Sequence, residues 1–222
     1  DVEYVNMQDP TKSFTGKHMT MKPQGTSSMG YPKKNFRLYT RKHDDTKIFD
    51  YQGYEINNRL YSFKDGAQPV DCWCFKADYA ESSGTHNTGI AKLWGKVMYD
   101  AQIDGEYKLR TNAQNIANAK GYPYDVRTTI DGFPCHMVYR LNESSDWVYI
   151  GKYNFNNDKG TPEVFGLNAD DESWEIRNNT SNRVIWKNDD FSGTDWKNDF
   201  EARHPKKNTD TSNLAALAAW IK

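Results

Sequence analysis

Residues 24–39 combine small hydroxyl residues, glycines and two adjacent lysines, a composition that can bind an anion. Glycine lets backbone amides approach a phosphate closely, and lysine supplies a compact positive charge. The spacing is not that of a Walker loop, because G-x-x-x-x-G-K-[ST] is absent. A polar turn that leads into a basic edge strand explains the same residues without a ligand. The candidate phosphate-binding residues are Gly25, Thr26, Ser27, Ser28, Lys33 and Lys34.

The cysteines have the residue type but not the spacing of a metal site. Cys72, Cys74, Cys135 and His136 could form a zinc site, but C-x-C is poor zinc spacing and no second pair exists. Cys72 and Cys74 share one face of a strand, too far apart along it for an easy disulfide. We therefore expect reduced thiols that act as small hydrophobic residues.

A second group, in the segment 154–160, matches only part of a calcium loop. Asn154, Asn156 and Asp158 have the alternation of calcium ligands, but Lys159 takes the position of the required glycine. The glutamate that closes such a loop is also missing. A tight turn rich in Asn, Asp and Gly explains these residues better, and we predict no metal site.

Four short motifs resemble the spore-coat CotH kinase-like family. Residues 25–28, Gly-Thr-Ser-Ser, and residues 31–38, Tyr-Pro-Lys-Lys-Asn-Phe-Arg-Leu, resemble its opening motif. The stretches 75–79, 81–89 and 151–155 continue the resemblance in the same order, so that it spans most of the chain. The similarity is closest to the CotH-like segments of bacteriophage tail and adsorption proteins. It implies a fold like the N-terminal lobe of a CotH-type kinase.

The resemblance adds Lys76 and Glu81 to the candidate nucleotide site. Lys76 ends a strongly apolar run, and Glu81 is the nearest carboxylate before the next helix. In kinase-like lobes a strand lysine contacts the nucleotide and pairs with an acidic residue of the following helix. Glu81 precedes the helix proper, however, and a lysine whose stem extends from a buried strand to solvent is the commoner explanation.

Composition limits the classes of function that the chain can have. The 222 residues carry 29 Lys and Arg against 30 Asp and Glu, so there is no basic field for nucleic acid. The 7 Trp, 14 Tyr and 10 Phe are too many for a disordered chain. No apolar run approaches the ~20 residues of a membrane span. The start at Asp1, without methionine, suggests a piece of a longer chain.

Periodicity predicts an α+β domain with a mostly antiparallel sheet and a few helices. Residues 1–16 are expected to form an N-terminal arm, and residues 17–222 a single domain. A three-stranded meander is expected over 126–155, with a hairpin turn at Asp131-Gly132 and a polar turn at 142–146. The helix 87–101 carries apolar residues at i, i+3, i+4, i+7 and i+8 and is expected to pack in the core. The expected strands are 17–22, 35–40, 55–63, 70–77, 126–130, 133–141, 147–155, 173–178 and 183–187, and the other expected helices are 112–119, 196–202 and 211–222, the last capped by Asp210 or Thr211.

The resemblance leaves two functions open, and composition adds a third. A CotH-type kinase would transfer phosphate from Mg-ATP to Ser or Thr of a surface protein, and it needs later carboxylates for catalysis and metal binding. The Asp pairs 170–171 and 189–190 are expected to lie in solvated loops and not to supply these carboxylates. We therefore expect no kinase activity and no cofactor within these residues. The resemblance to phage tail and adsorption proteins implies instead a structural module of a tail or baseplate, for assembly or host adsorption. Carbohydrate binding through Trp, Tyr, Asn and Asp is the third alternative.

The resemblance to phage tail proteins also implies partners and a location for the chain. The partners would be other virion subunits in an oligomeric assembly, and a carbohydrate or protein of the host surface. The location would be the virion tail, assembled in the host cytoplasm. Neither nucleic acid nor a membrane span is expected.

Overall fold

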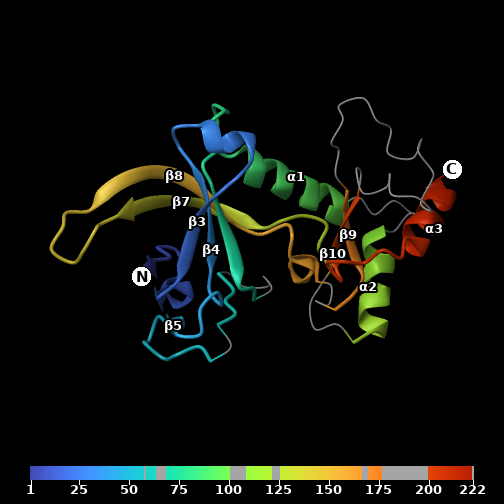
Figure 1. Ribbon diagram of the computed structural model, residues 1–222, viewed down its shortest axis with the longest axis horizontal. Coiled ribbons are helices and arrows are strands. Elements are labelled where there is room, and N and C mark those ends of the chain that lie inside the picture. Colours follow the sequence, from blue (N-terminus) through green and yellow to red (C-terminus); the bar gives the residue numbers. More distant parts are fainter. Residues whose placement is uncertain are drawn as a thin grey trace. The chain divides into compact units, whose positions relative to one another are not determined.

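A five-stranded antiparallel sheet organises the first part of the chain (Figure 1). The computed structural model describes residues 1–57, 59–63, 69–100, 109–121, 126–166, 170–176 and 200–221. The α+β class with mostly antiparallel strands is confirmed. The strand order is β3 (Thr20–Gln24), β4 (Asn35–Tyr39), β6 (Cys72–Lys76), β8 (Val148–Asn157) and β7 (Gly132–Tyr139).

The two faces of this sheet have opposite character, because successive side chains along each strand point to opposite faces. On one face Phe36, Phe75 and Phe155 are aligned across β4, β6 and β8. On the other face Arg37 lies opposite Cys74, which lies opposite Asn156. The predicted central strand at 70–77 is confirmed as β6, whose apolar side chains are buried.

A second, three-stranded sheet contributes to the core on the apolar face. It consists of β1 (Val2–Tyr4), β2 (Phe14–Lys17) and β5 (Lys47–Asp50). Residues 1–16, which we expected to form an arm, therefore provide strands and a buried aromatic ring. The members of the shared core cluster are Phe14, Leu38, Ile48, Tyr61, Phe63, Val70, Trp73, Phe75, Ala77, Tyr153, Phe155 and Val164.

The helices of this part are α1 (His86–Asp100) and α2 (Leu109–Ala119). Both confirm predicted helices, and α2 is followed by Gly121 with a φ of 70°. The expected role of α1 is wrong, because Ile90, Leu93, Trp94 and Val97 are between 45 % and 59 % exposed. In the described part of the chain, no helix has the length and apolar character needed to cross a membrane.

Two other predicted strands are wrong, because their backbone groups bond elsewhere. In 55–63, Arg59 has a φ of 55°, and only isolated bridges form at Glu55 and Tyr61. In 126–130, the Val126 amide donates to Gln114 of α2, and the Arg127 amide donates to the Phe165 carbonyl at 3.0 Å. These hydrogen bonds tie the segment to α2 and to the short 3-10 helix η3 (Pro162–Phe165).

The predicted meander is consequently a two-stranded hairpin of β7 and β8, turned at residues 142–146. Gly132 begins β7 instead of forming a turn with Asp131. A Cβ at Gly132 would lie 2.5 Å from the Phe155 carbonyl oxygen, so only glycine allows the two strands to approach there. The strand predicted at 17–22 is likewise divided between β2 and β3 at His18, which has a φ of 54°.

The chain divides into two compact units, Asp1–Leu167 and Asn168–Lys222, where we had expected one domain from residue 17. The second unit contains β9 (Ser173–Ile176), β10 (Phe200–His204) and α3 (Ser212–Ile221). β9 pairs with β10, so the predicted helix 196–202 is wrong at its described residues. The predicted strand 183–187 lies outside the described residues. The predicted C-terminal helix is confirmed as α3, with the Asp210 carboxylate accepting from the Ser212 amide.

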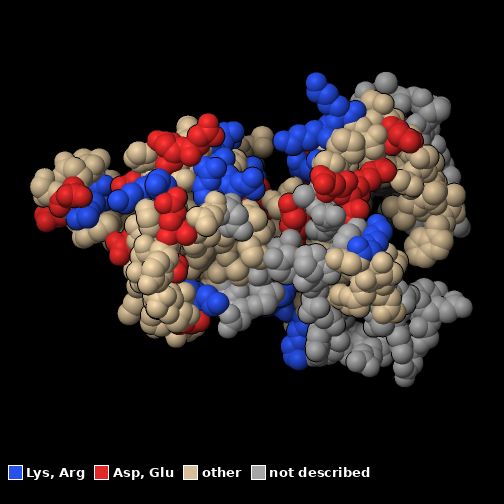
Figure 2. Space-filling view, turned by 90° about the horizontal axis from the view of Figure 1, so that it is seen from below, with Lys and Arg blue, Asp and Glu red and all other residues tan. Residues whose placement is uncertain are grey.

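The remaining short elements are the 3-10 helices η1 (Pro10–Lys12) and η2 (Ser27–Gly30). On the face shown in Figure 2, Lys and Arg are intermixed with Asp and Glu. This mixture agrees with the near-neutral net charge of −1.

Candidate functional site

The lysine loop, residues 25–34, joins β3 to β4 and contains η2. Gly25 has a φ of 135°, and a Cβ there would lie 2.0 Å from the Ser28 Oγ. The Ser28 Oγ accepts from Asn35 Nδ2 at 3.3 Å, while Thr26 and Ser27 form the start of η2. The Gly-Thr-Ser-Ser motif therefore makes a compact turn that is bonded to the first residue of β4.

Lys33 fastens the lysine loop to the sheet. Its Nζ donates to the Ala77 carbonyl at 3.0 Å and to the Lys152 carbonyl, and it lies 4.4 Å from the centre of the Tyr153 ring. Burial lowers the pKa of Lys33, the nearby Asp78 carboxylate opposes this change, and the neighbouring Lys152 adds to it. The side chain thus ties the end of β6 to the middle of β8.

The other two candidate lysines are bonded to different acceptors. Lys34 Nζ donates to the Met29 and Tyr31 carbonyls, both at 2.6 Å. Lys76 Nζ donates to Gln24 Oε1 at 2.9 Å. The structure therefore brings the lysine loop close to the end of β6, but the three ammonium groups bond to different acceptors.

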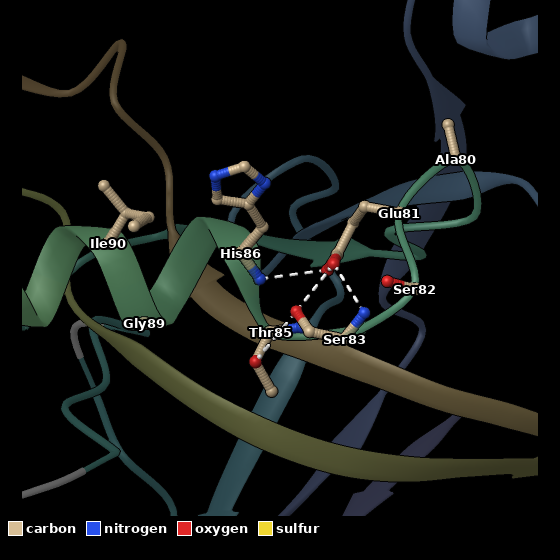
Figure 3. A pocket seen from close by; sticks show the side chains of 8 residues that line it. All are labelled: Ala80, Glu81, Ser82, Ser83, Thr85, His86, Gly89 and Ile90. Atoms are coloured by element: carbon tan, nitrogen blue, oxygen red, sulfur yellow. Dashed lines mark hydrogen bonds between the residues drawn. The ribbon is translucent and has the colours of Figure 1, made fainter.

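The Glu81 carboxylate is hydrogen-bonded to the N-terminus of α1 (Figure 3). Its Oε1 accepts from the His86 amide at 2.9 Å, and its Oε2 accepts from the Ser83 amide and hydroxyl at 2.8 Å and 2.6 Å. These bonds, the Ser83 hydroxyl first, lower the pKa of Glu81 to about 2. A helix N-terminus favours an anion, and here the Glu81 carboxylate occupies that position itself. The open pocket around it is lined by Ala80, Glu81, Ser82, Ser83, Thr85, His86, Gly89 and Ile90.

The replacement Glu81→Gln is expected to destabilise the protein at pH 7 but much less at pH 3. A carboxyl with a lowered folded pKa stabilises above its unfolded pKa of 4.5, and this contribution is lost as pH falls through about 2. Thermal unfolding midpoints of both proteins between pH 7 and pH 3 would measure it. A gap between the two midpoints that does not narrow over this range would contradict the role of Glu81.

Lys33→Met is expected to lower the free energy of unfolding by about 1–3 kcal/mol, because it leaves two carbonyls without their charged donor. Methionine keeps an apolar stem of similar length beside Tyr153. Lys34→Met is the matched control, since Lys34 bonds only within its own exposed loop, and it should cost less than about 0.5 kcal/mol. Urea titrations would compare the two, and equal losses would contradict a structural role specific to Lys33.

A buried polar network next to this site was not predicted from the sequence. Asn154 is 0 % exposed, and its Nδ2 donates to the Asp78 carboxylate and to the Gly84 carbonyl. Its Oδ1 accepts from the Thr88 hydroxyl at 3.1 Å, and the other Asp78 oxygen accepts from Asn87 Nδ2 at 3.3 Å. The network therefore fixes the loop between β6 and α1 against β8. The signal in the sequence was Asn154 and Asn156 alternating along a strand, which we had assigned to a turn.

A second polar cluster lies farther along the same face of the sheet. Arg37 forms an ion pair of 3.0 Å with Asp158, and the Cys72 thiol lies 3.7 Å from that carboxylate. Burial raises the pKa of Cys72, and the nearby Asp158 acts in the same direction, so the thiol stays protonated. The cluster holds β4 and β6 to the end of β8.

The cysteines are free and do not come together. Cys72 and Cys74 are buried on the polar face of the sheet, whereas Cys135 packs against the apolar core on the other face. Burial raises the pKa of Cys135 to about 12. Among the described residues, no group of three His, Cys, Asp or Glu side chains is placed to hold a metal ion.

Comparisons with models of protein families, with curated proteins and with solved structures find no match. The resemblance to CotH-like proteins is therefore carried by the sequence motifs alone.

Proposed function

We propose that this chain is a structural module of a bacteriophage tail or baseplate, for assembly or host adsorption, built on an incomplete CotH-like scaffold. One observation carries the proposal. The side chains of the CotH-like motifs, Lys33, Lys34, Lys76 and Glu81, are all bonded within the fold. A scaffold whose candidate ligand-binding groups are bonded within its own loops, strands and helix is suited to packing against other proteins.

Exposed aromatic and aliphatic side chains support a role in protein–protein contact. Trp94, Trp147, Tyr149 and Trp220 are each more than half exposed. Trp and Tyr are enriched among the residues that dominate binding energy at protein interfaces. The partners that follow from this role are other virion subunits or a protein of the host surface.

Immunogold labelling of purified particles tests the proposal. Antibodies against the 222-residue chain should mark the tail or its tip, and pre-immune serum should not. Labelling confined to host lysate, with none on intact or detergent-opened particles, would overturn the proposal.

The kinase alternative has less support, because a nucleotide would have to displace Lys33 and Lys34 from backbone carbonyls. Calorimetric titration with Mg-ATP distinguishes it. We expect no saturable binding by the wild-type chain. Saturable binding that is lost in Lys33→Ala, Lys34→Ala or Lys76→Ala would instead favour a nucleotide site.

The carbohydrate alternative depends on an aromatic face that is free to stack on a sugar. The guanidinium of Arg140 lies 4.6 Å from the centre of the Trp147 ring and therefore covers one of its faces. This contact favours a protein partner over a sugar at Trp147.

A further inference from the structure

The five-stranded sheet of the first unit has two outer edges, formed by β3 and β7. Within the described part of the chain, no further strand pairs with the outer side of either one. An edge strand presents backbone N–H and C=O groups that can pair with a strand of another chain, and many proteins block such strand addition. The direction in which each backbone group points decides whether an edge is open.

Hydrogen bonds near the end of β8 fix these directions for β7. The Asn157 amide donates to the Asp131 carbonyl at 3.0 Å, so the backbone groups of Asn157 point toward β7. Because directions alternate along an antiparallel strand, Phe155 also points toward β7, where it pairs with Phe133. Pro134, the next residue of β7, therefore has its nitrogen on the outer side.

Pro134 blocks the outer side of β7 because proline has no N–H to donate to an added strand. Its side chain is exposed, so the position is accessible from solvent. The preceding outward N–H, that of Gly132, is already bonded to the Asp131 carboxylate at 2.8 Å. Two successive outward positions of β7 thus offer no donor, and the next outward position is His136.

The opposite edge, β3, is blocked in the same way. The Thr40 amide donates at 3.0 Å to the carbonyl of Asp71, which directly precedes β6, so Thr40 points toward β6. Alternation along β4 makes Phe36 point toward β6 as well, away from β3. Pro23 pairs with Phe36 in register and therefore has its nitrogen on the outer side of β3, where it too is exposed.

A lysine closes the stretch of β8 that extends beyond β6. The pairing of β6 with β8 ends at Lys76, opposite Asn154, while β8 extends farther. Lys152, two residues before Asn154, points toward the side that β6 no longer covers, and its carbonyl accepts from Lys33 Nζ. An added strand would have to displace this charged donor, and lysine is a common residue at blocked edges.

We propose that Pro23, Pro134 and Lys33 close the five-stranded sheet to strand addition, so that the sheet does not continue into a neighbouring protein. Each of the three residues acts on a backbone position that would otherwise face outward. On β7 the blocked positions precede the bulge at Met137 and Val138. Backbone directions carry this inference, so it is independent of the tail function proposed above.

Removing one proline from the full 222-residue chain tests the proposal. Pro134→Thr restores an outward N–H on β7, and threonine favours strands without adding a large apolar surface. Pro32→Thr is the matched control, because Pro32 is an exposed proline of the lysine loop, outside the strands. The reversal variant combines Pro134→Thr with His136→Pro and removes the next outward N–H of the same edge. Circular dichroism and thermal unfolding would establish that each variant is folded.

Sedimentation velocity over a dilution series and amide hydrogen exchange supply the readout. We expect Pro134→Thr to form an additional species of about twice the mass of the wild-type species, in which β7 of two copies pairs antiparallel about a two-fold axis. The His136 amide should exchange more slowly in this species than in wild type. Wild type, the Pro32→Thr control and the reversal variant should not form it.

Three results would overturn the proposal. These are a Pro134→Thr chain that sediments like wild type at every concentration, a control or reversal variant that associates equally, and association without slower exchange at His136. If Pro134→Thr does not fold, Pro23→Thr decides in the same way at β3, with the amide of Met21 as the probe. Absence of label from phage particles would overturn the tail function and leave this inference unchanged.

Discussion

Phe155→Ala is expected to lower the free energy of unfolding by about 3–5 kcal/mol, the usual cost of removing a large buried ring. Phe155 is 1 % exposed and stands in the central part of the five-stranded sheet, where β8 lies between β6 and β7. Its ring is 4.3 Å from that of Phe63 and 4.4 Å from that of Phe75, centre to centre. Alanine would leave a cavity among aromatic rings that cannot move together to fill it. The other rings around it are Tyr4, Trp73 and Phe133.

Urea titration followed by fluorescence and circular dichroism would measure this loss. Tyr54→Ala is the matched control, since Tyr54 is 68 % exposed, and its loss should stay within about 0.5 kcal/mol. A loss below about 1 kcal/mol for Phe155→Ala would mean that the aromatic cluster is not closely packed in solution.

Asn154→Asp is the second large effect, with an expected loss of about 3–5 kcal/mol at pH 7. The amide Nδ2 of Asn154 donates to the Asp78 carboxylate, and aspartate would replace this donor with a second buried negative charge. Two carboxylates in contact cannot both ionise cheaply, and removing one partner from a buried charged network is strongly destabilising. The loop from β6 to α1 would lose its attachment to β8.

The pH dependence separates charge repulsion from the loss of hydrogen bonds. Repulsion raises the folded pKa of the carboxyl pair, so the penalty grows above the ordinary Asp value of ~3.9 and disappears below it. Asn154→Ala removes the two bonds that Nδ2 donates and also the bond that Oδ1 accepts from Thr88, but it adds no charge. The free energy of unfolding of Asn154→Asp, compared with that of Asn154→Ala, should therefore recover as pH falls from 7 to 4. A difference between the two variants that stays constant with pH would contradict the mechanism.

These two neighbours in β8 also show how the candidate site is built. Phe155 faces the aromatic core, while Asn154 faces the polar side and anchors the loop that precedes α1. Lys33 reaches the same region from the lysine loop and joins the end of β6 to the middle of β8. The site is thus a joint between strands, loop and helix, which is the reason for proposing a structural role for the CotH-like motifs.

The sequence predicted where most of the candidate residues lie in the secondary structure, but it did not predict which groups they contact. The sequence placed Lys33 and Lys34 in a loop between two strands and Lys76 at the end of a buried strand, and these positions are as expected. The acceptors of the lysines lie 44 and 119 residues away for Lys33 and 52 residues away for Lys76. Such distant partners leave no mark in local spacing. Glu81 is different, because its partners Ser83 and His86 are near in sequence and the capping role was open to local reasoning.

The sequence by itself determined the elements whose signal is local. The buried strand at 70–77, the strand at 35–40, the helix at 87–101, the polar turn at 142–146 and the α+β class all follow from periodicity and turn residues. Tertiary structure alone decided which elements pair and which faces are covered. An apolar row on α1 indicates a helix that needs a partner, but it does not say whether that partner lies in the same chain. The backbone amides of Val126 and Arg127 likewise bond to α2 and η3, because a hydrogen bond is satisfied by whichever acceptor the folded chain brings within reach.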